Sequence, residues 1–568
     1  MSSLSNQSTT FNAITGAKEA TGRRDYSNPF AKKQFLVVDC VPEMQRAMSM
    51  TLQSFGAEKV EYAGKASDAL VKLMRYDFDV VLCDYDLGSG SDGLYLYEEA
   101  KERNLLKQSC VFMIVSGERR AAKVLSAAEL APDGYLLKPF TGEELAKRLE
   151  VAMRRRDAFK VVDEALMSHD YMAAIDACSK KIGERNEFSL DFMKLKGSLS
   201  MKIGDYDSAH NLYQQVLKIK EIPWAKVGMA KSMAGLKKVE PAIGLFQQVI
   251  IENDRVMEAY DWLAKLYQDN HELDKAQQTL KRATELSPAT IRRHQALAQV
   301  AEENGDLEQA KKAYATTLDL AKASWHRSPA HYATLARTQL ASQDKAEAMK
   351  TLASLRRDYK HNPEGEWMAD VVDSSIQNHS GNKAAAEKLL RSAEERMPQL
   401  TKLKEADRME FARAAYGQGQ HEIGDKVARE LVRNNHDNEE LLQKLSTMFD
   451  QVGRGDAGRE LIASNVQGIV DLNNQAVREA QSGDHDKAIA LFQKALQEMP
   501  DNVQLMLNLV NAIIAQSHRQ GWHESHIRQA HELLQRVREM APTNNKFQKL
   551  LQAWRSLIEQ SQKREFLL

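Results

Sequence analysis

Four short apolar runs in the N-terminal part of the chain each end at a polar residue. The runs are residues 35–38, 80–83, 111–115 and 135–137. Runs of this kind, bounded by turn signals and separated by helical patterns, predict buried parallel strands. The polar residues that follow them are Asp39, Asp84, Ser116 and Lys138. Because ligands bind in the crevice beyond the ends of such strands, we expect the four side chains to converge there.

The residue types in this set suit a site that handles a phosphoryl group. Carboxylates hold a hard cation such as Mg²⁺, and one carboxylate can act as a nucleophile and become an aspartyl phosphate. A lysine and a hydroxyl supply charge and a hydrogen bond to phosphoryl oxygens. Asp84 suits the acceptor role because a glycine-rich loop, residues 87–93, follows it and is able to admit a donor.

Residues 31–157 resemble the receiver domain of bacterial two-component response regulators. The segments FLVVDC, DVVLCDYDLG, FMIVSGE and GYLLKPF carry the resemblance, in the family's order. It implies a doubly wound α/β domain with a five-stranded parallel sheet of the flavodoxin-like kind. It also implies that a sensor histidine kinase phosphorylates Asp84. Ser116 and Tyr135 would be the switch hydroxyl and aromatic, and Lys138 the charge anchor.

The resemblance further implies Mg²⁺ bound by Asp39, Asp84 and Asp86, the last through its backbone carbonyl. The family normally has two adjacent acids after the first strand, whereas this chain has Asp39 followed by Cys40. A neutral thiol is a poor ligand for Mg²⁺, so we expect phosphorylation with weakened metal affinity. The alternative is a degenerate receiver that serves as a phosphorylation-independent scaffold. A redox role for Cys40 and Cys83 is the less favoured interpretation; small buried side chains are the simpler one.

From about residue 157 the strand pattern ends and a helical repeat begins. Residues 259–288 and 474–500 share one layout of helix, short turn, helix and proline. A unit of about 34 residues with this layout is typical of tetratricopeptide repeats, which residues 158–545 resemble. We expect around ten units, several of them degenerate, in an all-α superhelix whose concave surface binds other proteins. The last unit is expected to have a lengthened turn at residues 517–521, and residues 546–568 to form a capping helix.

The junction between the two regions predicts a continuous helix. Residues 143–167 contain neither proline nor glycine, so the last helix of the α/β domain should run into the first repeat. Such a connection would transmit small rearrangements to the repeats.

Composition narrows the functional classes. A net charge of −1 and the lack of a basic helix-turn-helix segment argue against nucleic-acid binding and transcriptional output. No apolar run is long enough for a membrane span.

The cysteines and the N-terminus indicate the compartment. The four cysteines have no pairing pattern, as expected of a cytoplasmic protein. Residues 1–30 lack the layout of a secretory signal, and we expect them to form a disordered tail. No second catalytic motif is present, so we expect protein binding rather than an enzyme activity. Pairing of two receivers through the face containing Tyr135 stays open.

Overall fold

The computed structural model describes residues 30–88, 92–103, 105–106, 110–117, 132–322, 327–400, 403–436 and 438–566. Residues 1–29 of the predicted tail lie outside these residues. Phe30, which we placed in the tail, is buried against Phe35 and Phe55. The chain divides into two compact units, residues 1–327 and 328–568, and each is described by itself.

The N-terminal domain is built on the predicted parallel sheet. Its strands are β1 (Gln34–Val38), β2 (Lys59–Ala63), β3 (Val80–Asp84), β4 (Val111–Ser116) and β5 (Gly134–Leu137). They lie in the order β2-β1-β3-β4-β5, and every neighbouring pair is parallel. β2 is absent from the apolar runs because it is an edge strand with mostly exposed side chains.

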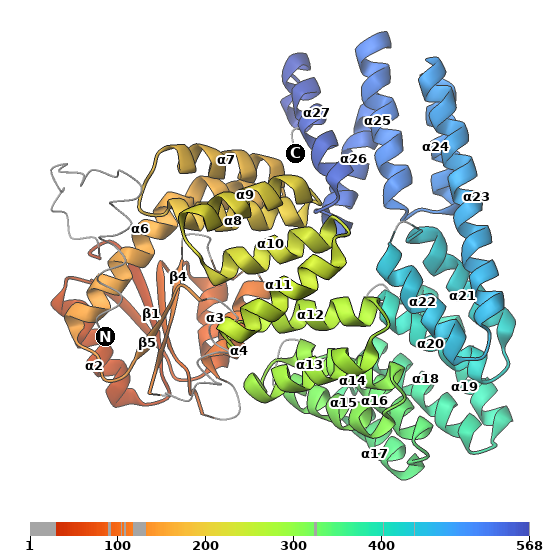
Figure 1. Ribbon diagram of the computed structural model, residues 1–568, viewed down its shortest axis with the longest axis horizontal. Helices are drawn as coiled ribbons and strands as arrows, with labels where there is room; N and C mark the ends of the chain where they lie inside the picture. Colours follow the sequence, from red (N-terminus) through yellow and green to blue (C-terminus); the bar gives the residue numbers. More distant parts are fainter. Residues whose placement is uncertain are drawn as a thin grey trace. The chain divides into compact units, whose positions relative to one another are not determined.

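Side chains alternate between two covered faces of this sheet. Leu36 and Phe112 pack with α3 (Ala66–Arg75) and α4 (Gly93–Glu102). Phe35 and Met113 pack with α2 (Pro42–Ser54) and the first half of α6 (Gly142–Met167). Figure 1 shows these two helix pairs on opposite sides of the sheet. Burial on both faces explains why the central strands read as continuous apolar runs.

Helix α6 confirms the predicted continuity of the junction. It runs for 26 residues, and the Thr141 side chain caps its N-terminus by accepting a hydrogen bond from the Glu144 N–H at 3.1 Å. Its first half belongs to the sheet core through Leu149, whereas Phe159 belongs to the core of the first repeat. There the Phe159 ring stacks on Phe192 with centroids 4.0 Å apart.

The rest of the first unit consists of helices that pack as successive hairpins. They are α7 (Tyr171–Gly183), α8 (Ser189–Lys202), α9 (Tyr206–Ile219), α10 (Pro223–Gly235), α11 (Val239–Glu252), α12 (Met257–Asp269), α13 (Leu273–Leu286), α14 (Ile291–Glu303) and α15 (Leu307–Lys322). Glycine is needed where Tyr213 packs between helices. A Cβ atom would lie 2.6 Å from this side chain at Gly197 and 2.4 Å from it at Gly228.

The second unit continues the same pattern. Its helices are α16 (Pro329–Ala341), α17 (Lys345–Asp358), α18 (Pro363–His379), α19 (Lys383–Arg396), α20 (Glu405–Gly417), α21 (His421–Asn434), α22 (Glu439–Gln451), α23 (Gly455–Ser482), α24 (His485–Glu498), α25 (Val503–Gln520), α26 (Glu524–Met540) and α27 (Asn545–Ser561). Two short 3₁₀ helices, η1 (Met397–Gln399) and η2 (Arg564–Phe566), follow α19 and α27.

Two predictions near the C-terminal end are wrong in detail. The segment expected to be a lengthened turn is helical as far as Gln520, because no residue before Gly521 interrupts α25; Gly521 then ends it at φ 92°. The capping helix ends at Ser561, where Gln562 takes a left-handed conformation. The chain then turns back, and Trp554 Nε1 donates to the Phe566 carbonyl at 2.9 Å.

Candidate functional site

The sheet places the four predicted polar residues along one edge. Asp39 follows β1, Asp84 ends β3, Ser116 ends β4 and Lys138 follows β5. The register aligns Asp84 with the residue before Ser116, and Ser116 with the last residue of β5. Parallel strands present their carboxyl ends on the same side, which explains the convergence.

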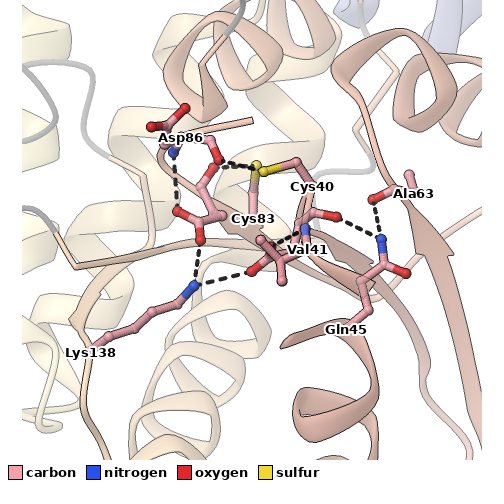
Figure 2. Close-up of polar contacts among 9 residues, drawn as sticks. Cys40, Val41, Gln45, Ala63, Cys83, Asp86 and Lys138 are labelled. Atoms are coloured by element: carbon pink, nitrogen blue, oxygen red, sulfur yellow. Dashed lines mark hydrogen bonds and ion pairs between the residues drawn. The ribbon is translucent and has the colours of Figure 1, made fainter. Parts of the chain in front are cut away.

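Lys138 joins the two carboxylates. Its Nζ donates to Asp39 Oδ2 at 3.1 Å and also to Asp84 Oδ2. The other carboxylate oxygens are held by backbone: Val41 N–H donates to Asp39 Oδ1 at 2.9 Å, and Asp86 N–H donates to Asp84 Oδ1 at 3.1 Å. Figure 2 shows this chain of bonds, with Lys138 reaching in from the strand end. The site is therefore an ordered cluster of two acids and one ammonium.

Ser116 and Tyr135 belong to β4 and β5, the two strands whose carboxyl ends lead to this cluster. Lys138 N–H donates to the Ser116 carbonyl at 2.7 Å, and the Ser116 side chain is buried. The half-buried Tyr135 side chain packs on the apolar face that α3 and α4 cover. Only Ser116, of these two residues, has a hydrogen bond to Lys138 among the contacts described above. Their switch roles stay predictions.

Asp86 contacts the Asp84 carboxylate with its backbone N–H, not with its own carboxylate. The carboxylate accepts a hydrogen bond from Gly88 N–H at 3.0 Å and so turns into its own loop. The Asp86 carbonyl accepts a weak hydrogen bond from Cys40 Sγ at 3.6 Å. The site thus offers two carboxylates and one carbonyl. Within the described ranges there is no group of three or more His, Cys, Asp or Glu side chains that could hold a metal ion.

The donor chemistry nevertheless fits Mg²⁺. This ion prefers oxygen ligands and keeps several of its waters, so the chain need not fill its coordination shell. Asp39, Asp84 and the Asp86 carbonyl are the oxygens that would hold it. Cys40 follows Asp39, and a carboxylate in its place would add an oxygen and a negative charge to this set; the effect of the thiol on Mg²⁺ affinity stays a prediction.

Partial burial shapes the electrostatics of the cluster. The side chains of Asp39, Asp84 and Lys138 are 8%, 15% and 19% exposed, so Asp84 is not sealed from solvent. Burial raises the pKa of the Asp84 carboxyl, against the opposing effects of the Lys138 ammonium and the Asp86 N–H. Burial disfavours the Lys138 ammonium, but its bonds to Asp84 and Asp39 leave the pKa of Lys138 raised.

The two thiols beside the site are held in the protonated form. Burial, followed by the charges of Asp39 and Asp84, raises the pKa of Cys40. Cys83 is fully buried, its Sγ donates to the Asp84 carbonyl at 3.2 Å, and burial raises its pKa well above the ordinary value. Cys83 is therefore the small buried side chain that we expected, whereas Cys40 is exposed, so the expectation of a buried side chain is wrong for Cys40.

Sequence reasoning missed two residues that shape the site. Gln45 Nε2 donates to the Asp39 carbonyl at 2.6 Å and to the Ala63 carbonyl at 3.3 Å, and so fixes the turn after β1. Gly93 begins α4, where a Cβ atom would lie 2.3 Å from the Asp84 carbonyl oxygen. The sequence marks Gly93 only as part of a flexible loop; its actual role is to permit a close approach.

Comparison with known proteins agrees with this geometry. The family model described as response regulator receiver domain matches residues 35–150. The chemotaxis protein CheY-3 of Vibrio cholerae serotype O1 is 30% identical over 122 residues, which are 22% of this chain and 92% of that protein. The chain belongs to the response regulator receiver family. The chemotaxis protein CheY of Pseudomonas aeruginosa is 28% identical to the receiver region over 122 residues, 22% of this chain and 97% of that protein.

The helical region matches a second family. Two tetratricopeptide repeat models match residues 258–290 and 479–519, so the helical region contains tetratricopeptide repeats. A solved tetratricopeptide repeat protein from Parabacteroides merdae is similar over 45% of this chain and 96% of its own, at 15% identity and a TM-score of 0.30. The receiver indicates two-component signalling, and the repeats indicate protein binding. No helix in the described part of the chain is both long and apolar enough to cross a membrane.

Proposed function

We propose that a sensor histidine kinase phosphorylates Asp84 and that this modification controls protein binding by the repeats. The observation that carries the proposal is the position of the Asp84 carboxylate. It lies at a strand end, is held by Lys138 and by the Asp86 N–H, and keeps 15% of its side chain exposed. A nucleophile must be both oriented and reachable, and this carboxylate is both.

The transfer uses groups that are already in place. An Asp84 oxygen attacks the phosphorus of a phosphohistidine; the new O–P bond forms as the N–P bond breaks, and the electron pair leaves with the imidazole nitrogen. Lys138 offsets the charge of the phosphoryl oxygens, and Ser116, at the end of β4, supplies a hydroxyl to donate to them. When bound, Mg²⁺ would add positive charge at the same oxygens.

Helix α6 could carry a structural change from the receiver to the repeats, because it belongs to the cores of both. One unbroken helix contributes Ala152 to the receiver core and Phe159 to the core of the first repeat. No flexible linker separates the two halves of α6, so a displacement of its receiver end would also move its end in the first repeat. Coupling of this kind requires an element that both sites bias, and α6 is that element.

Hydrogen exchange on the full chain tests this coupling. With acetyl phosphate and Mg²⁺, we expect altered amide protection in the second half of α6 and in α7. Asp84→Ala should abolish the change. Asp86→Asn should retain it, because that variant keeps the backbone carbonyl and amide used at the site. Unchanged protection in the phosphorylated wild type would contradict control of the repeats by Asp84.

Cys40 favours one alternative, a scaffold that works independently of phosphate. The Cys40 thiol donates a weak hydrogen bond to the Asp86 carbonyl, and it stands next to Asp39 where the receiver family normally has a second acid. In that case Mg²⁺ binding would be absent, and Asp84→Asn would leave partner affinity unchanged. Measured Mg²⁺ binding together with a phosphate-dependent change in the repeats would exclude the scaffold.

A further inference from the structure

A short segment after α27 folds back onto the last helices of the second unit. α27 ends at Ser561, and we call residues 562–566, which include η2, the hook. Phe566, at the end of the hook, is only 8% exposed. Its ring centroid lies 6.0 Å from that of Trp522 and 5.8 Å from that of His531. The hook thus places a phenyl ring in a pocket of aromatic side chains.

The pocket also binds the backbone of its occupant. Trp554 Nε1 donates to the Phe566 carbonyl at 2.9 Å, and His531 Nδ1 lies 3.3 Å from the same oxygen. Gln535 Nε2 lies 2.9 Å from His531 Nε2. Because an amide nitrogen only donates, His531 Nε2 is the acceptor, so the ring proton is on Nδ1 and points to the carbonyl. Two donors therefore recognise the carbonyl while the aromatic side chains hold the ring.

Phe566 is the anchor of the hook. Among the side chains of the hook that the structure describes, it is the buried one; Lys563 and Glu565 are exposed. The ion pair between these two residues, at 4.0 Å, lies within the hook and faces solvent, so it contributes little. A segment held by one side chain can be displaced by a ligand that offers the same groups.

The hook also leaves one donor of the pocket unused. Trp522 Nε1 is buried and has no hydrogen-bond partner among the described residues. Burying a donor without a partner is costly, and an occupant with an acceptor at this point would remove that cost. The hook is therefore not the best ligand that the pocket could take.

We propose that this pocket binds a phenylalanine side chain and its backbone carbonyl from a partner polypeptide, and that the hook competes with that partner. The hook itself shows the chemistry of the ligand, because it is a peptide segment already seated there. Trp522, His531 and Trp554 supply the ring contacts and the donors that an incoming phenylalanine needs. The inference rests on the protein-binding role proposed for the repeats and gives that role a site and a partner chemistry.

The test measures binding of a fluorescent nine-residue peptide, IEQSQKREF with an amidated end, which copies residues 558–566. In fluorescence polarisation, the full chain carrying Phe566→Ala should bind it at least about tenfold more tightly than the wild type does. The reason is that the hook of the wild type competes at a high effective concentration. A peptide with alanine in place of phenylalanine should bind Phe566→Ala at least about tenfold more weakly.

A matched pair of variants, each combined with Phe566→Ala, tests the contacts. Trp554→Phe keeps an aromatic ring and removes the N–H that binds the carbonyl, so it should weaken peptide binding about fivefold. Trp522→Phe makes the same chemical change where the N–H has no partner, and it should stay within about twofold. A larger loss in Trp522→Phe than in Trp554→Phe would overturn the inference.

Two further measurements separate binding from folding. Glu565→Gln, on the exposed part of the hook, should bind the peptide as weakly as the wild type does. In the wild type, excess peptide should speed hydrogen exchange of the Phe566 N–H, which donates to the Lys563 carbonyl at 3.1 Å. This measurement needs no substitution, and unchanged exchange would overturn the inference.

Other outcomes also overturn the inference. They are equal peptide affinity of the wild type and Phe566→Ala, and binding that does not depend on the phenylalanine of the peptide. Wild-type dimers that Phe566→Ala abolishes would assign the pocket to a second copy of the chain instead. Because no phosphodonor is present, none of these results bears on phosphorylation of Asp84.

Discussion

Arg156 and Asp133 tie helix α6 to the beginning of β5. Arg156 Nε donates to Asp133 Oδ1 at 2.9 Å, and its Nη2 donates to Asp133 Oδ2 at 2.7 Å. Asp133 Oδ2 also accepts from the Phe112 N–H of β4 at 2.8 Å. The pair lies just before the strand that leads to Lys138. The helix that enters the repeats is thus bonded to the strand that carries the site's cation.

Removing this link should loosen the receiver. Arg156→Ala leaves a carboxylate that is only 7% exposed without its bidentate partner. Breaking such a pair costs about 3 kcal/mol. We expect faster hydrogen exchange in β4 and β5. Arg154→Ala, which removes a surface pair to Glu187, should change local stability by less than about 1 kcal/mol. Equal exchange rates in the two variants would contradict the structural role of Arg156.

Cys40→Asp should strengthen Mg²⁺ binding. The change restores a carboxylate oxygen and a negative charge beside Asp39, where the thiol offers neither. We expect an affinity gain of about tenfold or more by calorimetric titration. Cys40→Ser is the matched control, since it is similar in size and uncharged, and it should stay close to the wild type. An unchanged affinity in Cys40→Asp would show that residue 40 does not face the ion.

Lys138→Met should raise the pKa of Asp84 further. Burial already raises this pKa, and the ammonium that opposes the rise is removed, leaving two carboxylates close together. A carboxyl with a raised folded-state pKa stabilises the fold at low pH and loses that contribution as pH rises through the pKa. The variant should therefore lose stability relative to the wild type as pH increases. Carbon-13 NMR of the aspartate carboxyls measures the shift, and a lowered pKa would contradict the role given to Lys138.

Asp163, on the second half of α6, should make the stability of the protein depend on pH. Burial raises its pKa to about 6, against the opposing charges of Arg156 and Arg155. Its contribution to stability is complete below about pH 4, the unfolded value, and is lost as pH rises through about 6. Asp163→Asn should therefore be the more stable protein at pH 7.5, by about 1 kcal/mol after solvent screening. Thermal unfolding should show this difference vanishing near pH 4; a less stable variant at pH 7.5 would contradict it.

Sequence patterns predicted what depends on strand ends and helical periodicity. Asp39, Asp84 and Lys138 meet because parallel strands share one carboxyl edge, and α6 is continuous because nothing in it breaks a helix. They did not predict local bonding choices. The Asp86 carboxylate accepts a hydrogen bond from the Gly88 N–H, an outcome set by loop conformation rather than residue type. Nor did they locate β2, whose exposed edge position removes the apolar signal.

The most direct test of the account is the mass of the intact protein after incubation with acetyl phosphate and Mg²⁺. The account predicts one added phosphoryl group on the wild type, located on the peptide that contains Asp84 and absent from Asp84→Ala. An unmodified wild-type protein, or an Asp84→Ala variant that carries the same added mass, would contradict it.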